Sequence, residues 1–409
     1  MGQKIWILNH FAISKDGRNT KFAKFLGKKN NEVKIFCSSF SHKNKTETQN
    51  YGFLSFFHKE TCENYEKIYV RTPSYKSNNF KRIINHLVFG FLIFLYGLFK
   101  RKKPDIIIGS IQHFFSGLAG YFLSRLRSLP FILEVRDFWP ETLIGLGYLK
   151  EDSLITKVMY KTEKFLFKYS DHIVSVLPKG EKYIKTKDIP SEKITYIPNG
   201  LIIDDFMYYK ENFSVPNDIK RKLNNDKFNI IYTGAIGVPN KLCILLNTIN
   251  KLNNMNYEDE IECFIFGDGV KKNELEKLKQ KNNINNFHFM GYVDYKFIPD
   301  ILSYADILIG KLSYNKVHRF GTSLNKLFDY LAAQKEIIYA SRPDNEPFSD
   351  VKNIHFIKGD DEKELANKII DIKDNNVDAT GIDGFDYLVN NHSYEILTEK
   401  YESIIYELI

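Results

Sequence analysis

The sequence predicts an α/β protein built from two doubly wound, Rossmann-like domains that face a central cleft. The chain has 409 residues, more than one ordinary hydrophobic core holds, and 43% of them are hydrophobic. Apolar runs of strand length alternate with longer segments of helical spacing in the first half, and the alternation begins again in the second half. Nearly continuous apolar strands separated by helices are typical of a parallel sheet covered on both faces.

The predicted strands form two sets with a polar stretch between them. The first set covers residues 5–8, 33–36, 68–70, 106–108, 131–135, 173–176 and 194–197. The second set covers residues 230–232, 263–266, 287–290, 306–309, 337–339 and 354–357. We place the hinge between Pro198 and about Asn225, where charged residues and Pro216 interrupt the apolar pattern. The predicted domains are therefore residues 1–197 and 198–388, followed by a terminal helix over residues 389–409.

Composition limits the partners and the compartment. The chain carries 58 basic and 50 acidic residues, a net charge of +8 that suits an anionic membrane or an anionic substrate. No recognisable nucleic-acid module accompanies this charge, so we expect no nucleic-acid partner. The 4 cysteines are scattered without a C-x-x-C pair, which favours a reducing, cytoplasmic setting. The short apolar run after the amino terminus is a strand and not a signal peptide.

The most informative motif lies late in the chain, between two predicted strands. It runs from Arg319 through Thr322, Ser323, Leu324, Asn325 and Lys326 to Asp329. Ser323 can cap a helix, which places Asn325 and Lys326 where free N–H groups and the positive helix end attract an anion. Asp329 shares their face and offers a carboxylate to hydroxyl donors. One short helix could therefore hold a diphosphate and the ribose attached to it.

A simpler interpretation is a solvated helix face with an i,i+3 ion pair between Lys326 and Asp329. The flanking sequence argues for a ligand site instead. Residues 305–310 and 336–341 read as strands, so the motif occupies a strand-loop-helix-strand crossover. Ligands of open parallel sheets bind in such loops, at the carboxyl ends of the strands.

The late motif resembles the donor-site signature of glycosyltransferase family 4, retaining enzymes of GT-B fold that use nucleotide diphosphate sugars. The similarity is closest to the branch that builds bacterial O-antigen and capsule repeat units, including N-acetylfucosaminyltransferases. It extends through nearly all of the chain. The matching runs are Glu134-Val135-Arg136-Asp137-Phe138-Trp139-Pro140-Glu141-Thr142, Ile197-Pro198-Asn199-Gly200, Tyr232-Thr233-Gly234-Ala235 and Phe266-Gly267-Asp268-Gly269.

The resemblance implies an amino-terminal acceptor domain, a carboxyl-terminal donor domain and a terminal helix that crosses back to the first domain. It also implies a nucleotide-sugar donor, with UDP as the expected nucleotide, and a polyprenyl-diphosphate-linked saccharide acceptor. The sugar expected is an N-acetylamino or deoxy hexose. One departure is that the family's first Glu of its loop-and-helix pair is replaced by Gly321, while Asp329 stands at the second acid. Recognition of the donor sugar's hydroxyls is therefore unassigned.

In the second domain, glycines after three predicted strands let the backbone approach a phosphate or a base closely. These are Gly234, Gly267 with Asp268, and Gly291. The resemblance implies that Tyr292 and Val293 line the base site and that Lys241 helps to clamp the diphosphate, although the family's Arg beside it is Ala235 here. Lys326 and Arg319 are the charges expected to stabilise the leaving nucleotide diphosphate. The full donor-binding set is Gly17, Gly234, Lys241, Gly267, Asp268, Gly291, Tyr292, Val293, Thr322, Ser323, Leu324, Asn325, Lys326 and Asp329.

In the first domain, Arg136 and Asp137 follow a buried strand, and charges in that position are costly unless they are used or paired. We expect both to be catalytic residues in the cleft; a structural pair that fastens the loop is the alternative. His113, after the strand at residues 106–108, is a further catalytic candidate, although a lone His is often only a hydrogen-bonded core residue. The resemblance implies that Gly17 makes room near the diphosphate, while the role of Arg18 stays open.

Residues 83–99 form an apolar segment at the short limit for a bilayer span, and they contain Asn85 and His86. The basic cluster Lys100-Arg101-Lys102-Lys103 follows at once, a pattern that suits the anionic inner face of the plasma membrane. We expect peripheral attachment there; a core helix with a solvated basic end is the alternative.

The sequence shows no cofactor motif and no His or carboxylate group with metal spacing. We therefore expect a metal-independent, retaining transfer that needs no cofactor, with same-face attack assisted by the leaving phosphate as in the family. Two other functions remain open: a nucleotide-sugar epimerase of the same fold, and an inactive, membrane-bound sugar-nucleotide binder, which the replacement at Gly321 suggests. A dinucleotide oxidoreductase would want a Gly-x-Gly-x-x-Gly after the first strand, and that motif is missing.

Overall fold

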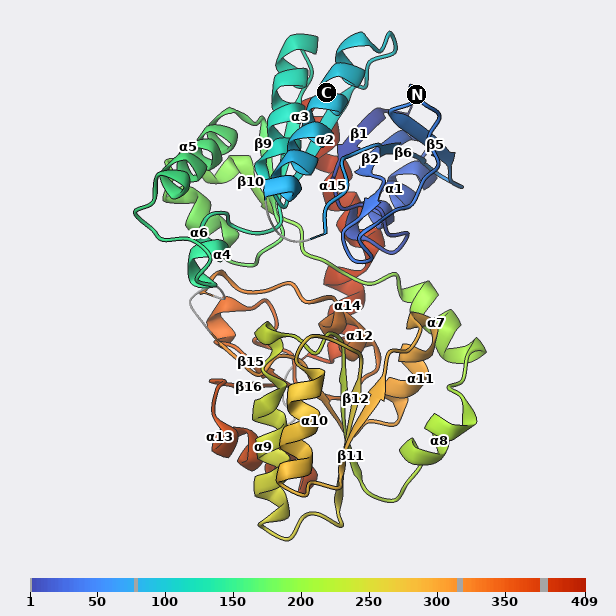
Figure 1. The fold of residues 1–409 in the computed structure, drawn as a ribbon, viewed down its shortest axis with the longest axis vertical. Helices are drawn as coiled ribbons and strands as arrows, with labels where there is room; N and C mark the ends of the chain where they lie inside the picture. Colours follow the sequence, from blue (N-terminus) through green and yellow to red (C-terminus); the bar gives the residue numbers. More distant parts are fainter. Residues whose placement is uncertain (1, 77–79, 315–318, 376–381) are drawn as a thin grey trace. The chain divides into compact units, whose positions relative to one another are not determined.

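The fold is described from a computed structural model that covers residues 2–76, 80–314, 319–375 and 382–409 (Figure 1). The chain divides into two compact units. Unit 1 contains Met1–Asn199 and Tyr394–Ile409, and unit 2 contains Gly200–Ser393. The carboxyl-terminal boundary lies at Ser393 instead of residue 388, because α14 (Gly384–His392) packs with unit 2 and only α15 (Tyr394–Leu408) belongs to unit 1.

Unit 1 is built on an eight-stranded sheet in the order β10-β9-β8-β7-β1-β2-β6-β5. All neighbouring strands are parallel except the edge strand β5, which pairs antiparallel with β6 and was not predicted. A short hairpin of β3 and β4 was not predicted either. The strands are β1 (Lys4–Leu8), β2 (Glu32–Ser38), β3 (Phe40–Ser41), β4 (Thr46–Glu47), β5 (Phe57–Thr61), β6 (Glu66–Val70), β7 (Ile106–Ile111), β8 (Phe131–Val135), β9 (His172–Ser175) and β10 (Ile194–Tyr196).

The helices of unit 1 pack onto this sheet in two groups. Helices α2, α3 and α5 contact one another, while α1 contacts α15, with Phe22 against the rings of Tyr394 and Tyr401 at 5.1 Å between centroids. The chain end is thereby fixed to the first helix of the unit. The helices are α1 (Arg18–Lys28), α2 (Phe80–Phe99), α3 (Phe114–Arg127), α4 (Glu141–Gly145), α5 (Leu154–Tyr169), α6 (Gly180–Lys185) and α15, with a 3-10 turn at Ser191–Lys193.

Unit 2 is built on a six-stranded parallel sheet in the order β13-β12-β11-β14-β15-β16. The strands are β11 (Phe228–Thr233), β12 (Ile261–Phe266), β13 (Phe287–Gly291), β14 (Ile307–Ile309), β15 (Glu336–Ala340) and β16 (Ile354–Ile357). Each predicted strand of both halves has a counterpart within a few residues, because completely buried parallel strands need an unbroken apolar run. The two doubly wound α/β domains of the predicted fold class are both present.

Helices cover both faces of the unit 2 sheet. One apolar cluster contains residues of α9, α10 and α13, and a second contains residues of α7, α11, α12 and α14. The predicted linker therefore contains two helices, α7 and α8, of which α7 buries Phe206 in the second cluster. The helices are α7 (Ile203–Asn212), α8 (Asn217–Leu223), α9 (Leu242–Asn253), α10 (Lys272–Lys281), α11 (Ile298–Ser303), α12 (Asn325–Ala332), α13 (Glu362–Lys373) and α14.

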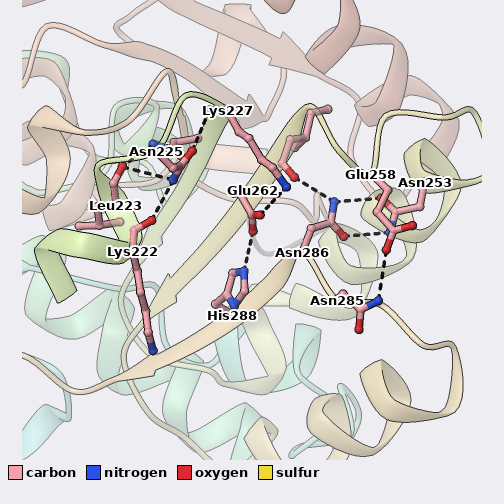
Figure 2. A network of polar contacts seen from close by, with 12 residues as sticks. Lys222, Leu223, Asn225, Lys227, Asn253, Glu258, Glu262, Asn285, Asn286 and His288 are labelled. Atoms are coloured by element: carbon pink, nitrogen blue, oxygen red, sulfur yellow. Dashed lines mark hydrogen bonds and ion pairs between the residues drawn. The ribbon is translucent and has the colours of Figure 1, made fainter. Parts of the chain in front are cut away.

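Polar side chains tie together the amino ends of three neighbouring strands in unit 2. Figure 2 shows Glu262 of β12 between Lys227, which precedes β11, and His288 of β13. The Lys227 ammonium donates to Oε1 at 2.9 Å, and the His288 Nε2 lies 2.5 Å from Oε2. Asn253 and Asn286 exchange amide hydrogen bonds beside them. These contacts connect the amino ends of β11, β12 and β13 with one another.

Candidate functional site

The glycines predicted to approach a ligand meet at the carboxyl edge of the unit 2 sheet. Gly234, Gly267 and Gly291 lie at the ends of β11, β12 and β13, with φ of +136°, +144° and +81°. Gly234 N–H donates to Phe266 O at 2.8 Å, and Gly267 N–H donates to Gly291 O at 2.7 Å. A Cβ on Gly267 would lie 1.8 Å from the Gly234 carbonyl oxygen, so no side chain fits there. The ends of these neighbouring strands therefore carry no side chains that would block a close approach of a ligand to the backbone.

Lys326 reaches this glycine edge from α12. Its Nζ lies 3.6 Å from the centroid of the Tyr232 ring and 3.2 Å from the point that a Cβ on Gly234 would occupy. The Nζ is buried and has no hydrogen-bond partner among the described residues, although part of the side chain is exposed. Burial lowers the pKa of Lys326 to about 7. A buried cation without a counterion is costly, and a bound anion would remove that cost.

The first turn of α12 adds to this anion site. The helix begins at Asn325, so the N–H groups of Asn325 and Lys326 belong to its positive end. The predicted cap was wrong: Leu324, and not Ser323, precedes the first helical residue, and it gives no side-chain cap. The sheet order also changes direction here, because β11 lies between β12 and β14. Such a topological switch point is where open α/β sheets bind ligands.

Asp329 lies one turn further along α12, and its carboxylate is largely buried. Its Oδ1 accepts a hydrogen bond from the Tyr295 hydroxyl at 2.6 Å. Lys326 and Asp329 therefore do not form the i,i+3 ion pair of the simpler interpretation, since the ammonium has no hydrogen-bond partner in the described chain. The two side chains serve separate contacts, as a diphosphate and a ribose would require.

A carboxylate that the sequence did not reveal lies beside the Gly321-Thr322 turn. Glu346, in the loop after β15, is 4% exposed and accepts hydrogen bonds from Ser341 Oγ at 2.7 Å and Thr322 Oγ1 at 3.3 Å. Burial raises the pKa of Glu346, and the nearby Lys311 ammonium opposes that rise. Lys311 Nζ is itself buried without a hydrogen-bond partner in the described chain, and burial lowers its pKa to about 8. The carboxylate of Glu346 therefore lies beside the turn at Gly321, the position where the family carries a Glu.

The other donor-site predictions lie further out. Lys241 pairs with Asp360 at 2.6 Å, with both side chains partly exposed, so a diphosphate would have to compete with that carboxylate. The Arg319 guanidinium lies 4.8 Å over the ring of Phe320. Asp268 Oδ1 accepts from Gly269 N–H at 2.8 Å, as in a turn. The structure does not assign a ligand contact to any of these three side chains.

The predicted base-site residues differ in exposure. Tyr292 is 69% exposed in the loop after β13, so it is not the core tyrosine that a buried ring there would be. Val293 and Leu324 both pack against the second apolar cluster of unit 2, so their side chains are partly buried in that core. Their contact with a base stays a prediction.

In unit 1, the structure brings two of the catalytic candidates together. His113 and Asp137 line one small pocket with Ile111, Gln112, Phe114 and Trp139. The two follow the neighbouring strands β7 and β8, whose carboxyl ends lie side by side. The charge of Arg136 interacts with Glu134 and with Asp137. Burial raises the pKa of Asp137 to about 6, and the Arg136 charge opposes that rise. The described residues show no ion pair at contact distance between Arg136 and Asp137, so a pair that fastens the loop stays a prediction.

Arg18, beside the predicted Gly17, proves to be structural. Gly17 precedes α1, and Arg18 is 4% exposed. The guanidinium of Arg18 donates to Glu134 Oε2 at 2.9 Å and to the Ile197 carbonyl at 2.7 Å. A ligand would therefore have to displace a buried ion pair to reach Arg18. Because Glu134 lies mid-strand in an apolar run, only its charge hinted at this network.

Two further histidines join His113. His10 follows β1, His86 belongs to α2, and the ligand nitrogens of the three lie within 4.8 Å of one another. The expectation that no metal is bound stays a prediction, but these three histidines could hold a metal ion. Sequence spacing could not show this cluster, because its members come from three distant segments.

Comparisons with known proteins agree with this fold. The model of Glycosyltransferase Family 4 matches residues 19–205, and the model of Glycosyl transferases group 1 matches residues 227–375. A putative colanic acid biosynthesis glycosyl transferase WcaI of Escherichia coli K12 is 23% identical over 210 residues. That alignment spans 51% of this chain and 50% of the relative.

Solved structures with the same fold cover almost the whole chain. Sucrose-phosphate synthase of Thermosynechococcus elongatus is 14% identical, with a TM-score of 0.73 over 99% of each chain. Anabaena Alr3699/HepE in complex with UDP-glucose is 10% identical, with a TM-score of 0.66 over 99% of this chain and 100% of that one. At such identities the likeness shows the fold alone, which is GT-B.

Proposed function

Because the chain belongs to glycosyltransferase family 4, we propose that it transfers a sugar from a nucleotide diphosphate donor to a lipid-linked saccharide. The acceptor in this proposal is a polyprenyl-diphosphate-linked saccharide of O-antigen or capsule synthesis. The relative WcaI carries colanic acid biosynthesis in its name, which supports polysaccharide synthesis as the setting. The donor sugar in the proposal is an N-acetylamino or deoxy hexose.

The observation that carries the proposal is the buried ammonium of Lys326 beside Gly234 and at the first turn of α12, which has no hydrogen-bond partner among the described residues. A diphosphate there would meet a cation and the positive end of a helix together, beside glycines that leave room for its close approach. UDP is the nucleotide of the proposal, since solved proteins of the same fold bind UDP and UDP-glucose. Asp329 would accept hydrogen bonds from the ribose hydroxyls.

We infer a retaining transfer in which the leaving diphosphate takes part in removing the acceptor proton. Lys326 would stabilise the negative charge that develops on the diphosphate, with Arg319 as a second charge from the same loop. His113 and Asp137 would position the acceptor and sugar hydroxyls on the unit 1 side. The diphosphate charge is met by side chains in this mechanism, so it needs neither a cofactor nor a divalent cation at the diphosphate.

The proposal is tested with purified protein, a panel of UDP-sugars and a polyprenyl-diphosphate-linked sugar. Release of UDP together with a lengthened lipid-linked product is the expected result. Interconversion of donor epimers without any acceptor would favour the epimerase instead. Binding of UDP without UDP release from any donor would favour the inactive binder.

Asp329→Ala is expected to weaken UDP binding by about 10- to 100-fold, because a hydrogen bond to a charged group contributes roughly 1.5–3 kcal/mol. Calorimetry with UDP and with 2′-deoxy-UDP measures the effect. The wild type should prefer UDP, and the variant should lose that preference, since the lost contact is to the ribose. An unchanged preference in Asp329→Ala would count against the ribose role.

We propose that α2 attaches the protein to the inner face of the plasma membrane, as a peripheral protein in the cytoplasm. Helix α2 is long and apolar enough to span a bilayer, but residues such as Asn85, Phe89 and Ile93 are buried in unit 1. Ile83, Leu87 and Phe91 are at least half exposed on its other side. The exposed Lys100–Lys103 cluster follows, so an apolar face ends in a group of charges that anionic lipids attract.

The double variant Arg101→Ala/Lys102→Ala should bind anionic vesicles roughly 30-fold more weakly at low salt, at about 1 kcal/mol per basic residue. Co-sedimentation with phosphatidylglycerol-containing and purely phosphatidylcholine vesicles measures this. Arg221→Ala/Lys222→Ala removes the same two residue types from the exposed end of α8 and should have little effect. Equal losses in both double variants would indicate a general charge effect and reject the α2 site.

A further inference from the structure

Three buried histidines form a compact cluster at the carboxyl edge of the unit 1 sheet. His10 follows β1, His113 follows β7, and these strands are hydrogen-bonded neighbours where the sheet order changes direction. His86 comes from α2 and stacks on His113, with 4.0 Å between ring centroids. The exposed fractions of His10, His86 and His113 are 3%, 5% and 4%.

Each histidine of this cluster has at least one ring nitrogen without a hydrogen-bond partner in the described part of the chain. Among the described residues, His10 Nδ1, His86 Nε2 and both ring nitrogens of His113 are buried without a hydrogen bond. Buried polar atoms are normally paired, and several unpaired ones in a single place call for a ligand. The ligand nitrogens lie within 4.8 Å of one another, so one small species could contact all three residues.

The side-chain chemistry suits a metal ion. Each neutral imidazole ring carries a nitrogen lone pair that can bind a metal. Neutral imidazole is a preferred ligand of zinc, whereas magnesium and calcium prefer oxygen.

A second residue fixes the orientation of His10. Asn85 Nδ2 donates to Thr72 Oγ1 at 2.8 Å and to the Pro73 carbonyl at 2.7 Å, so Asn85 Oδ1 must be the atom facing His10. This oxygen can only accept, which makes His10 Nε2, at 2.6 Å, the donor. The lone pair of His10 is thus on Nδ1, the unpartnered nitrogen. Metal-ligating histidines are commonly held by such a bond on the other ring nitrogen.

We propose that His10, His86 and His113 bind one Zn²⁺ ion, with the fourth position taken by water or a substrate oxygen. With zinc–nitrogen bonds of about 2.0–2.1 Å, tetrahedral ligand nitrogens lie roughly 3.3 Å apart, so the rings must turn toward each other on binding. This site belongs to unit 1, whereas the anion site at Lys326 belongs to unit 2. The positive charge of Arg82 interacts with all three histidines. It would therefore repel a cation bound between them.

The test is zinc binding to the full chain after removal of metals with a chelator. Equilibrium dialysis should give one Zn²⁺ per wild-type chain, and Co²⁺ in its place should produce the visible spectrum of a nitrogen-ligated ion. His10→Ala and His113→Ala should each weaken binding by more than about 100-fold, because losing a metal ligand costs more than losing a residue that only hydrogen-bonds to a ligand. His58→Ala, which removes an exposed histidine of β5, is the matched control and should bind as the wild type does.

Two variants of neighbouring residues distinguish specific zinc binding at this cluster from nonspecific binding elsewhere on the chain. Asn85→Ala should weaken zinc binding about 10- to 100-fold by releasing the His10 ring. Arg82→Gln should tighten it, because a repelling charge is gone. If the alanine variants do not fold, Co²⁺-shifted histidine proton resonances in the wild type still decide the matter.

Failure of the wild type to bind zinc, or retention of zinc in both His10→Ala and His113→Ala, would mean an adventitious ion only and overturn the site. These measurements involve no sugar transfer. Their outcome is therefore separate from that of the proposed function.

Discussion

Lys326→Ala is expected to lower the turnover of sugar transfer by about 10²-fold or more, the loss typical when a preorganised charge at a developing anion is removed. The structural reason is that the Lys326 ammonium is buried against Tyr232 and has no hydrogen-bond partner in the part of the chain that the structure describes. A bound anion would supply the missing partner. Initial rates of UDP release measure the effect.

Two further variants isolate the role of the charge. Lys277→Ala removes an exposed lysine from α10 of the same unit and should keep the wild-type rate. Lys326→Arg keeps a positive charge in a different shape, so it should retain more activity than Lys326→Ala. A wild-type rate in Lys326→Ala would refute the assignment.

The pH dependence of UDP binding tests the same residue in another way. The pKa of Lys326 is lowered to about 7 by burial, and only the ammonium form attracts the diphosphate. Affinity should be greatest below about pH 7 and should fall by up to about tenfold per pH unit above it, because binding then requires uptake of a proton. Lys326→Arg stays protonated and should lose this slope. Since both proteins bind the same ligand, titration of UDP itself cancels in the comparison.

Glu134→Ala should lower the free energy of unfolding of unit 1 by about 3–5 kcal/mol, because it leaves the buried guanidinium of Arg18 without its partner. Glu134 is completely buried and also accepts hydrogen bonds from Asn19 Nδ2 at 2.9 Å and Ser110 Oγ at 2.7 Å. Urea unfolding followed by tryptophan fluorescence is selective for this unit, since the 2 tryptophans of the chain, Trp6 and Trp139, both lie in it.

A double-mutant cycle shows whether the loss comes from the pair. Arg18→Ala with Glu134→Ala should cost less than the sum of the single changes, because the buried charge of Arg18 is then no longer left without Glu134. Lys164→Ala breaks the exposed pair with Asp188, of similar length at 2.8 Å, and should change stability little. Additive single effects would contradict a coupled network.

The Glu134 network also sets a pH dependence. Burial alone would raise the pKa of Glu134, but Arg18 and the other donors hold it below the ordinary value. The stabilisation is therefore present above the pKa of glutamate in the unfolded chain and is lost as the pH falls through the folded value. The free energy of unfolding of Glu134→Ala should therefore come closer to that of the wild type as the pH is lowered.

The sequence predicted those features that depend on residues close together in the chain. Each parallel strand was predictable, because a strand buried on both faces needs an apolar run that no other local structure requires at that length. The glycines at 234, 267 and 291 were identifiable because residues at those strand ends adopt positive φ. Lys326 and Asp329 stood out from their spacing near the start of α12. The antiparallel edge strand β5 was missed because its burial pattern is mostly exposed and gives no apolar run.

The sequence by itself determined the fold class, the strand ends that form the candidate site and the helix that carries Lys326. Only the tertiary structure decided which charged groups meet. It placed Glu346 beside Thr322, Arg18 against Glu134, and His10 and His86 against His113. The spacing of apolar residues along the chain predicts helices and strands, because their periodicity is local. A side-chain cluster forms from distant segments that the order of strands in the sheet brings together. The spacing of residues in the chain does not predict that order.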